Sequence, residues 1–426
     1  MSPISTFFHK LKLVFTDSAI RNRLLFVAAA FVVFRFLSAV PIPGIDHFAL
    51  EQFFSNNQFF GLLSIFSGGG FAQLSIVMLG VGPYITASII MQLATVISSK
   101  VKAMYTEEGE AGRTKFIALS RTITIPLAIL QGVAFLSLLE SQGIITSLTP
   151  FAFAVNVFLI AAGSMLLMWM GELMTEFGIG NGVSLIIFAG IISGLPAGIS
   201  QTIFTATAAD IPAYLGFFIL ALAAIYAVIM VSEAERSIPI AYARQVRGAA
   251  AATGAATYLP IRLLQAGVIP IIFALSLLLL PQMALAGLSA IGVQGISGVV
   301  SAYTAFTNNP WAHSAVYFVL VVIFTYFYTS ITFEPHRVAD NLQKSGAFIP
   351  GVRPGRETEA YIGNVVNRVT LPGAVFLGAI AVVPFVVQGI TGITAILVGG
   401  TALLIAVTVL LDLIRKIDAQ ISLREY

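Results

Sequence analysis

The sequence contains no cysteine and few charged residues. Asp, Glu, Lys and Arg together make up 10% of its 426 residues, whereas hydrophobic residues make up 58%. The mean hydropathy is +0.95. Without cysteine there can be no disulfide, no thiol nucleophile and no cysteine-ligated metal. So little charge in so apolar a chain excludes an ordinary soluble domain. The composition predicts one integral membrane domain over residues 1–426.

Apolar runs of membrane length recur along the chain. An α-helix needs about 20 residues to cross hydrocarbon. Ten such runs lie near 24–40, 74–97, 116–139, 151–171, 183–203, 212–231, 263–286, 314–333, 369–388 and 393–411. Ten spans divide into two sets of five, and an odd number in each half gives the halves opposite orientations. We therefore expect an all-α polytopic membrane protein with an N-terminal half (1–203), a C-terminal half (204–411) and a tail (412–426).

The cations lie on one side of these spans. Of the 22 Lys and Arg residues, 20 fall in the two tails and in alternate loops, of which the largest are about 232–262 and 334–368. The opposite loops carry no Lys or Arg, and their charged residues are all acidic, namely Asp46, Glu51, Glu140 and Asp210. The positive-inside rule makes the cationic side cytoplasmic. Both termini are therefore predicted to be cytoplasmic.

Groups that bind ions or catalyse reactions are scarce within the spans. No acidic residue or histidine lies at mid-span, whereas ion-coupled transporters usually need one there. Arg35 and Arg121 lie in or at the end of spans, where they can snorkel or pair. The motif GISG (295–298) matches a serine-protease pattern, but no span offers a histidine base. An intramembrane protease is therefore excluded, an inverted-repeat secondary transporter remains the alternative to a channel, and any driving energy must come from a partner.

Two segments are unusual for membrane-protein loops. The outer segment 59–70 is apolar, too short to cross, and ends in three glycines. It is either a re-entrant loop or a mobile stopper that folds into a funnel. The cytoplasmic segment 344–355 contains Pro350, Gly351, Pro354 and Gly355, which together favour a stiff turn with Arg353 at its tip. Such scaffolding favours a docking element.

Several ordered motifs carry a resemblance. They are PIPGID (41–46), IFSGG (65–69), PYITASII (83–90), EEGEAGR (107–113), TEFGIGNG (175–182), AGVIP (266–270) and ADNLQKSGAFIPGVRPG (339–355). Over nearly its whole length the chain resembles the SecY family, the pore subunits of the bacterial Sec protein-conducting channel. The resemblance implies ten transmembrane helices in two inverted five-helix halves around a central hourglass pore with a lateral gate. It also implies a bacterial inner-membrane location, passage of unfolded secretory chains, and lateral release of signal sequences and transmembrane helices into lipid.

The resemblance also assigns sites. The implied pore ring is Val81, Ile85, Ile187, Ile272 and Ile405. The implied plug, about 59–72, includes Phe60, Gly61, Leu62, Leu63, Ile65, Phe66, Ser67, Gly68 and Gly69. The gate, between the second and third spans and the seventh and eighth, would include Gln92, Leu264 and Gln265, with Leu264 where relatives often have Asn. The implied docking residues are Arg244, Arg247, Lys344, Arg353, Pro354 and Gly355.

The implied partners are proteins and lipid. They are SecE-like and SecG-like small membrane subunits, the SecA motor ATPase, the ribosome, secretory and membrane-protein precursors, and the bilayer. Basic loop tips suit acidic protein surfaces and rRNA phosphates. Gly248 and four alanines follow Arg247, which weakens the electrostatic case for ribosome binding there. We expect no catalytic residue, metal or cofactor, and therefore no enzyme activity.

Overall fold

The chain is described by a computed structural model over residues 16–43, 74–141, 145, 148–205, 211–242, 257–265, 267, 269–290, 295, 297–391 and 394–422. It divides into two compact units. One comprises Met1–Phe218, Leu275–His313 and Pro384–Tyr426, and the other comprises Ile219–Ala274 and Ser314–Val383. The two units are called here the first and the second unit.

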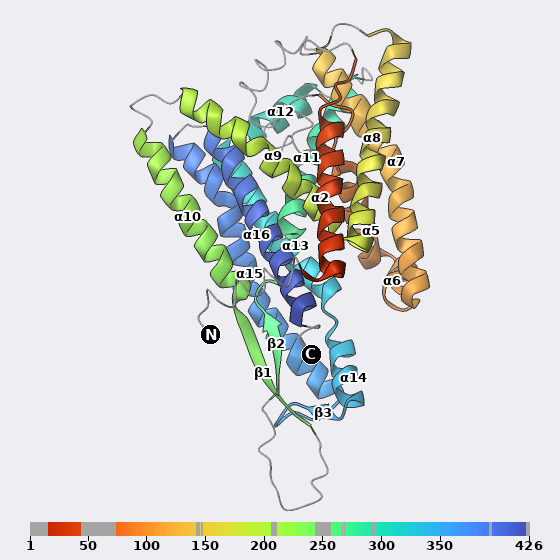
Figure 1. Cartoon of the computed structure of the whole chain (residues 1–426), viewed down its shortest axis with the longest axis vertical. Coiled ribbons are helices and arrows are strands. Elements are labelled where there is room, and N and C mark those ends of the chain that lie inside the picture. Colours follow the sequence, from red (N-terminus) through yellow and green to blue (C-terminus); the bar gives the residue numbers. More distant parts are fainter. Residues whose placement is uncertain are drawn as a thin grey trace, which may run out of the picture. The chain divides into compact units, whose positions relative to one another are not determined.

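Helices dominate both units (Figure 1). The helices before the first strand are α2 (Ser18–Ser38), α5 (Gly82–Ile97), α6 (Ser99–Thr106), α7 (Gly109–Ser141), α8 (Pro150–Phe177), α9 (Gly182–Thr205) and α10 (Ile211–Glu233). The later helices are α11 (Ile269–Ala290), α12 (Ser297–Asn308), α13 (Pro310–Thr332), α14 (Pro335–Lys344), α15 (Arg356–Thr391) and α16 (Thr394–Ser422). The strands are β1 (Glu235–Tyr242), β2 (Thr257–Arg262) and β3 (Ala347–Phe348).

Each predicted span overlaps one of these helices. Within the described residues, four helical stretches are long and apolar enough to cross a membrane, or five if the bent pair α5–α6 counts as one. The four are Gly109–Glu140, Pro150–Phe177, Pro310–Lys344 and Arg356–Val387. The protein is therefore a predominantly helical membrane protein, and the count of ten spans stays a prediction.

The second predicted span, 74–97, is only partly helical. Residues 74–81 form turns, and α5 begins at Gly82. Positive φ angles at Leu74 (42°) and Gly80 (57°) break the helix there, and Pro83 occupies its first turn, where a missing N–H costs nothing. After α5, extended backbone at Ser98 bends the chain by 111° into α6.

The turn segment 74–81 is buried against other parts of the first unit. Leu74 and Val77 are fully buried. The main chain of 40–42 bonds to it: the Ile42 N–H donates to the Leu74 carbonyl and the Ile76 N–H to the Val40 carbonyl, at 2.9 and 3.0 Å. These bonds satisfy polar groups that a helix would have satisfied internally.

The prediction of an all-α fold was wrong for the loops of the second unit. Strands β2, β1 and β3 form an antiparallel sheet in that order, with Glu235 opposite Arg262 and Ala241 opposite Phe348. In β1, Ile238 and Ile240 are buried while Ser237 and Pro239 are exposed. This alternation with a period of two is typical of a strand with one covered face. Residues 243–256, between β1 and β2, lie outside the described part.

The sheet packs on helices through a small hydrophobic core. Its buried members come from β1, β2, the segment after β3 and α15, and they are Ile238, Ile261, Ile349, Ile362 and Val366. Phe333, Val338 and Leu342 pack against them from the end of α13 and from α14. We call this part of the second unit, residues 235–262 and 333–369, the loop subdomain. Figure 1 shows the three strands and α14 gathered there.

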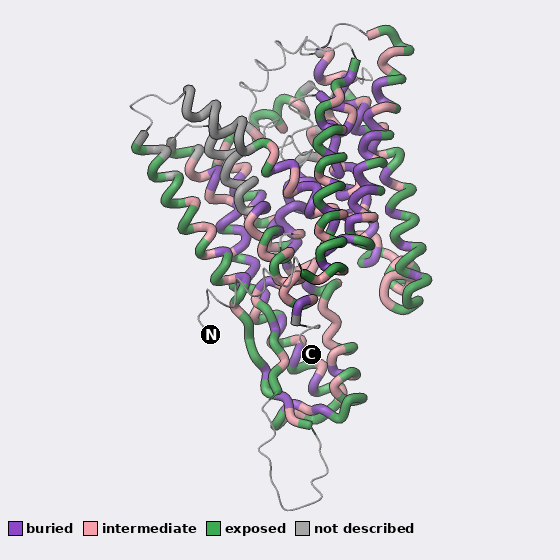
Figure 2. Tube along the Cα trace, in the orientation of Figure 1, coloured by how far each residue is buried: buried purple, intermediate pink, exposed green. Residues whose placement is uncertain are grey.

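In the first unit, the helices that begin and end the described chain meet. Ile20 of α2, Ile179 of the α8–α9 turn and Ile421 of α16 form a buried cluster. Asp17 caps α2 by accepting hydrogen bonds from the Ala19 and Ile20 N–H groups, at 2.8 and 3.4 Å. Helix α8 packs against α2, α5, α7 and α9, and α9 packs against α16. Figure 2 shows buried and exposed residues alternating along α7 and α8.

Gly163 provides a test of this packing. A Cβ at Gly163 of α8 would lie 2.1 Å from the Ile76 carbonyl oxygen, which is main chain and cannot rotate away. We expect Gly163→Ala to lower stability by about 1–3 kcal/mol through overpacking. The measurement is the melting temperature of the purified protein in detergent. The matched control is Gly216→Ala on α10, where a Cβ meets nothing within 4 Å; equal melting temperatures for the two variants would contradict the packing described.

Candidate functional site

The five aliphatic positions of the implied pore ring are all buried. Their exposed fractions are 0% for Val81, 5% for Ile85, 1% for Ile187, 4% for Ile272 and 0% for Ile405. Val81 is the N-cap of α5 and Ile85 lies in its first turn, whereas Ile187 lies on α9 and Ile405 on α16. These four belong to the first unit, and Ile272 of α11 belongs to the second.

Within the first unit the ring positions sit on a connected series of helices. Helix α5 packs on α8, α8 on α9, and α9 on α16. Helix α5 also has two distinct faces, because Ile85 is buried whereas Ile90 is 39% exposed. The side chains at the ring positions are aliphatic, so they carry no hydrogen-bonding group.

The implied gate residues have different surroundings. Gln92 lies on α5, and its Oε1 is buried with no hydrogen-bond partner among the described residues. Leu264 and Gln265 precede α11, although the predicted span 263–286 included them. The reason is local: β2 continues to Arg262, Gly267 has a φ of 58°, and Pro270 occupies the first turn of α11. Leu264 is 8% exposed, and Gly373 of α15 packs closely against it.

Some implied site residues cannot be placed. All of the plug, including Phe60 to Gly69, lies outside the described residues, and so do Arg244 and Arg247. Their assignments stay predictions.

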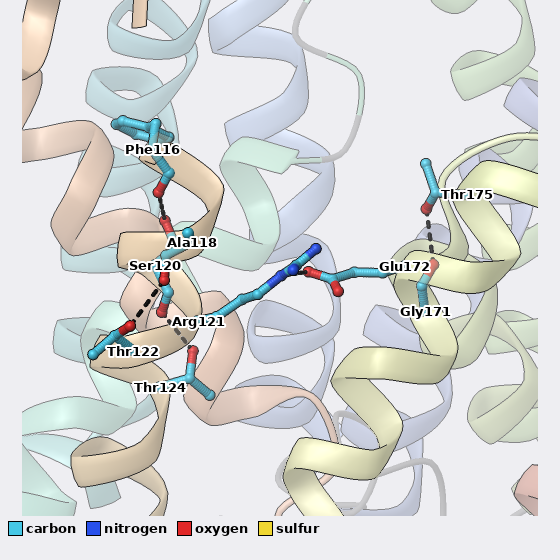
Figure 3. Close-up of polar contacts among 9 residues, drawn as sticks. All are labelled: Phe116, Ala118, Ser120, Arg121, Thr122, Thr124, Gly171, Glu172 and Thr175. Atoms are coloured by element: carbon cyan, nitrogen blue, oxygen red, sulfur yellow. Dashed lines mark hydrogen bonds and ion pairs between the residues drawn. The ribbon is translucent and has the colours of Figure 1, made fainter. Parts of the chain in front are cut away.

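An ion pair joins two helices of the first unit. Arg121 of α7 points toward Glu172 of α8, and its Nε donates to Glu172 Oε1 at 2.7 Å (Figure 3). The Glu172 side chain is 19% exposed and that of Arg121 is 49% exposed. A carboxylate so far removed from water needs a cation or several donors. The pairing predicted as one option for Arg121 is therefore present.

Neighbouring hydroxyl groups on α7 are satisfied within the helix. Ser120, Thr122 and Thr124 donate to the carbonyls of Phe116, Ala118 and Ser120, at 3.0, 3.0 and 2.8 Å (Figure 3). Two residues after Thr124, Pro126 lies inside the helix and removes the N–H that would bond to the carbonyl four residues earlier. The three hydroxyl groups therefore find their hydrogen-bond acceptors within α7, whereas Arg121 donates to Glu172 of α8.

The α8–α9 joint beside Glu172 is tight. The Thr175 hydroxyl donates to the Gly171 carbonyl at 2.8 Å and accepts from the Gly182 N–H at 2.9 Å. A Cβ at Gly182 would lie 1.9 Å from the Gly171 carbonyl oxygen, so only glycine fits. Arg121 thus attaches α7 to a firmly joined pair of helices.

The implied docking loop lies in the loop subdomain. Lys344 ends α14 and is exposed, as are Arg353 and Pro354. Gly351 and Gly355 have φ angles of 84° and 97°, conformations that favour glycine. The sequence therefore predicted the turn correctly, with Arg353 on its surface.

Polar contacts join the two helices that flank this loop. His336 of α14 lies 3.2 Å from Glu359 of α15 through Nδ1, and 3.7 Å from Asp340 through Nε2. All three side chains are well exposed, so the contribution of these contacts to stability is small. They tie the start of α14 to the start of α15.

Sequence reasoning missed Glu172 and the residues that hold the docking loop. Glu172 lies one residue beyond the predicted span 151–171, while α8 continues to Phe177. A lone cation in an apolar stretch, as at Arg121, was the available signal that a carboxylate lay nearby.

The ion pair yields a prediction about stability. We expect Arg121→Gln and Glu172→Gln each to lower stability by about 1–2 kcal/mol, because each leaves one charge without its partner. The double variant Arg121→Gln with Glu172→Gln should lose less than the sum of the two single losses, because it leaves neither charge unpaired. Melting temperatures of the single and double variants measure the coupling. The control is the exposed pair Lys115–Glu108, 3.6 Å apart, for which the same cycle should give almost no coupling energy. Strictly additive effects at Arg121 and Glu172 would refute the pairing.

Comparisons with known proteins agree with this fold and these motifs. A sequence profile of the SecY family matches residues 75–414. Protein translocase subunit SecY of Mycobacterium tuberculosis is 38% identical over 435 residues, covering 96% of each chain. The Streptomyces coelicolor subunit of the same name is 37% identical and covers 97% of each chain. Among solved structures, a protein-conducting channel has a TM-score of 0.67 at 20% identity, and covers 95% of this chain and 93% of its own. Sec61 in a canine ribosome–channel complex has a TM-score of 0.64 with the same identity and coverage. The chain belongs to the SecY family.

Proposed function

We propose that the chain is the central, pore-forming subunit of a protein translocation channel. Unfolded secretory polypeptides would cross the membrane through it, and signal sequences and transmembrane helices would leave it sideways into lipid. The observation that carries this proposal is the identity of 37–38% with protein translocase subunits over nearly the full length of both chains. As a SecY family member the chain is a channel subunit and not an enzyme.

The architecture proposed for it is ten spans in two inverted halves, 1–203 and 204–411, around an hourglass pore. Val81, Ile85, Ile187, Ile272 and Ile405 form its constriction. Buried aliphatic side chains at all five positions support this role. An apolar constriction excludes water and ions by dewetting, and it accepts many sequences because it offers no specific hydrogen bonds.

Opening is proposed to use a plug and a gate. In a solved SecY channel with a similar fold, the plug domain stabilises the closed state of the channel and maintains a membrane seal. In this chain the corresponding segment is about 59–72. The gate includes Gln92, Leu264 and Gln265, and the unpartnered Gln92 Oε1 supports a position where contacts change. Because Leu264 stands where relatives often have Asn, the proposed closed gate is more apolar than one with an amide pair.

The proposed partners supply the driving force. SecE-like and SecG-like small subunits, a SecA-type motor ATPase and the ribosome fit a bacterial inner-membrane channel with both termini cytoplasmic. The proposed docking residues are Lys344 and Arg353, which are exposed on the loop subdomain, and Arg244 and Arg247, which lie outside the described residues. A solved Sec61 neighbour was captured as part of a ribosome–channel complex, which supports docking of this kind. An inverted-repeat transporter is not favoured, because the relatives are translocase subunits.

Photocrosslinking tests the proposed path. With a photoreactive residue at Ile85 or Ile187, a secretory chain stalled during SecA-driven and ATP-driven transport should form adducts that require its signal sequence. The physical reason is proximity, since the chain must pass the constriction. Adducts are read on gels after purification of the channel subunit.

The matched control is Ile90, on the same helix as Ile85 but 39% exposed. Adducts at Ile85 and Ile187 with few at Ile90 agree with the proposed path. Equal labelling at all three positions, with the motor bound and active, would place the path elsewhere and reopen the transporter alternative.

A further inference from the structure

Thr358 occupies an unusual position for a hydroxyl side chain. It is the third residue of α15 and only 2% exposed, while its neighbour Glu357 is exposed. Ile362 and Val366 follow at intervals of four, so all three lie on the face of α15 that packs into the core of the loop subdomain. A buried hydroxyl at such a place needs a hydrogen-bond partner.

The partner is the main chain of the docking tip. The Thr358 Oγ1 donates to the carbonyl oxygen of Arg353 at 2.8 Å, across five residues. No feature of the sequence singles out this threonine, and neither the pore nor the gate uses it.

Few other bonds can hold the tip in place. Pro354 has no N–H to donate, and it favours extended backbone at Arg353. On either side, the Val352 N–H donates to the Ile349 carbonyl at 3.1 Å and the Glu359 N–H to the Gly355 carbonyl at 3.0 Å. Between these two bonds, the contact from Thr358 is the one that reaches the Arg353 carbonyl directly.

We infer that Thr358 is a positioning residue, which fixes the main chain of Arg353 so that its guanidinium is presented to a docking partner in one orientation. This inference rests on the proposed function, because it takes Arg353 as a docking residue. A prearranged tip lowers the ordering cost that binding must otherwise meet. Loss of the bond leaves the charge in place but spreads the tip over more conformations.

The test uses Thr358→Val, which keeps the shape of the side chain and removes the hydroxyl. It is made in the full channel with its small subunits, in vesicles supplied with purified SecA, ATP and a secretory precursor. We expect the SecA concentration for half-maximal transport to rise roughly threefold to tenfold, the effect of one lost hydrogen bond on a binding-competent conformation. The maximal rate at saturating SecA should stay unchanged. Thr358→Ser, which keeps the hydroxyl, should restore the wild-type concentration dependence.

Two further variants separate the possible outcomes. Val366→Ala makes a cavity in the same core but leaves the Thr358–Arg353 hydrogen bond in place, so it should lower the melting temperature without changing the SecA dependence. If it shifts that dependence as Thr358→Val does, or if Thr358→Ser behaves like Thr358→Val, the positioning role is overturned. Arg353→Ala tests the docking role itself: no shift for it refutes docking at Arg353, whereas a shift for it and none for Thr358→Val refutes only the role of Thr358.

Discussion

The hydrocarbon of a membrane offers no water to main-chain N–H and C=O groups, so each must find its partner within the protein. Long helices meet this requirement almost everywhere in the described chain. The exception is the turn segment 74–81, which is tolerated because protein covers it on every side. The main chain at 40–42 bonds to it, and the Ser164 hydroxyl donates to the Gly80 carbonyl at 2.8 Å. Gly163 permits this approach, because any larger residue would meet the Ile76 carbonyl.

The same shortage of water governs the charged side chains. Arg121 enters an apolar stretch of α7 because Glu172 meets it, and Glu172 is held by a helix joined to α9 through Thr175 and Gly182. Most other cations lie in loops and tails, where water or a partner solvates them. The five proposed ring positions carry aliphatic side chains. Side chains without hydrogen-bonding groups are what a constriction without sequence preference requires.

The sequence predicts those features of the structure that depend on long stretches of residues better than those that depend on one or a few residues. Apolar runs of about 20 residues are long signals, and each predicted span meets a helix. Features that depend on a few residues are not predicted in this way. The positive φ of Leu74 moves the start of α5 toward the C-terminus of the predicted span. The alternation of Ile238 and Ile240 is too short to indicate a strand within a charged loop. An isoleucine such as Ile187 cannot be told from a packing residue by composition, so the ring depends on the resemblance. Thr358 has no sequence signature, because its role comes from a contact with Arg353 across a turn.

The described chain divides its recognition between two kinds of surface. The five positions of the proposed ring carry apolar side chains, which would not discriminate between the polypeptides proposed to pass them. The loop subdomain does the opposite: its sheet, α14 and α15 enclose a core that includes Ile238, Ile261 and Ile362. That core needs no lipid, and it supports a turn whose glycines and prolines leave Arg353 few conformations. A stiff cationic tip can select one partner, whereas a constriction that must pass many sequences cannot select at all. On the proposed assignments, selection of a partner therefore belongs to the loop subdomain, and tolerance of many sequences to the apolar ring positions.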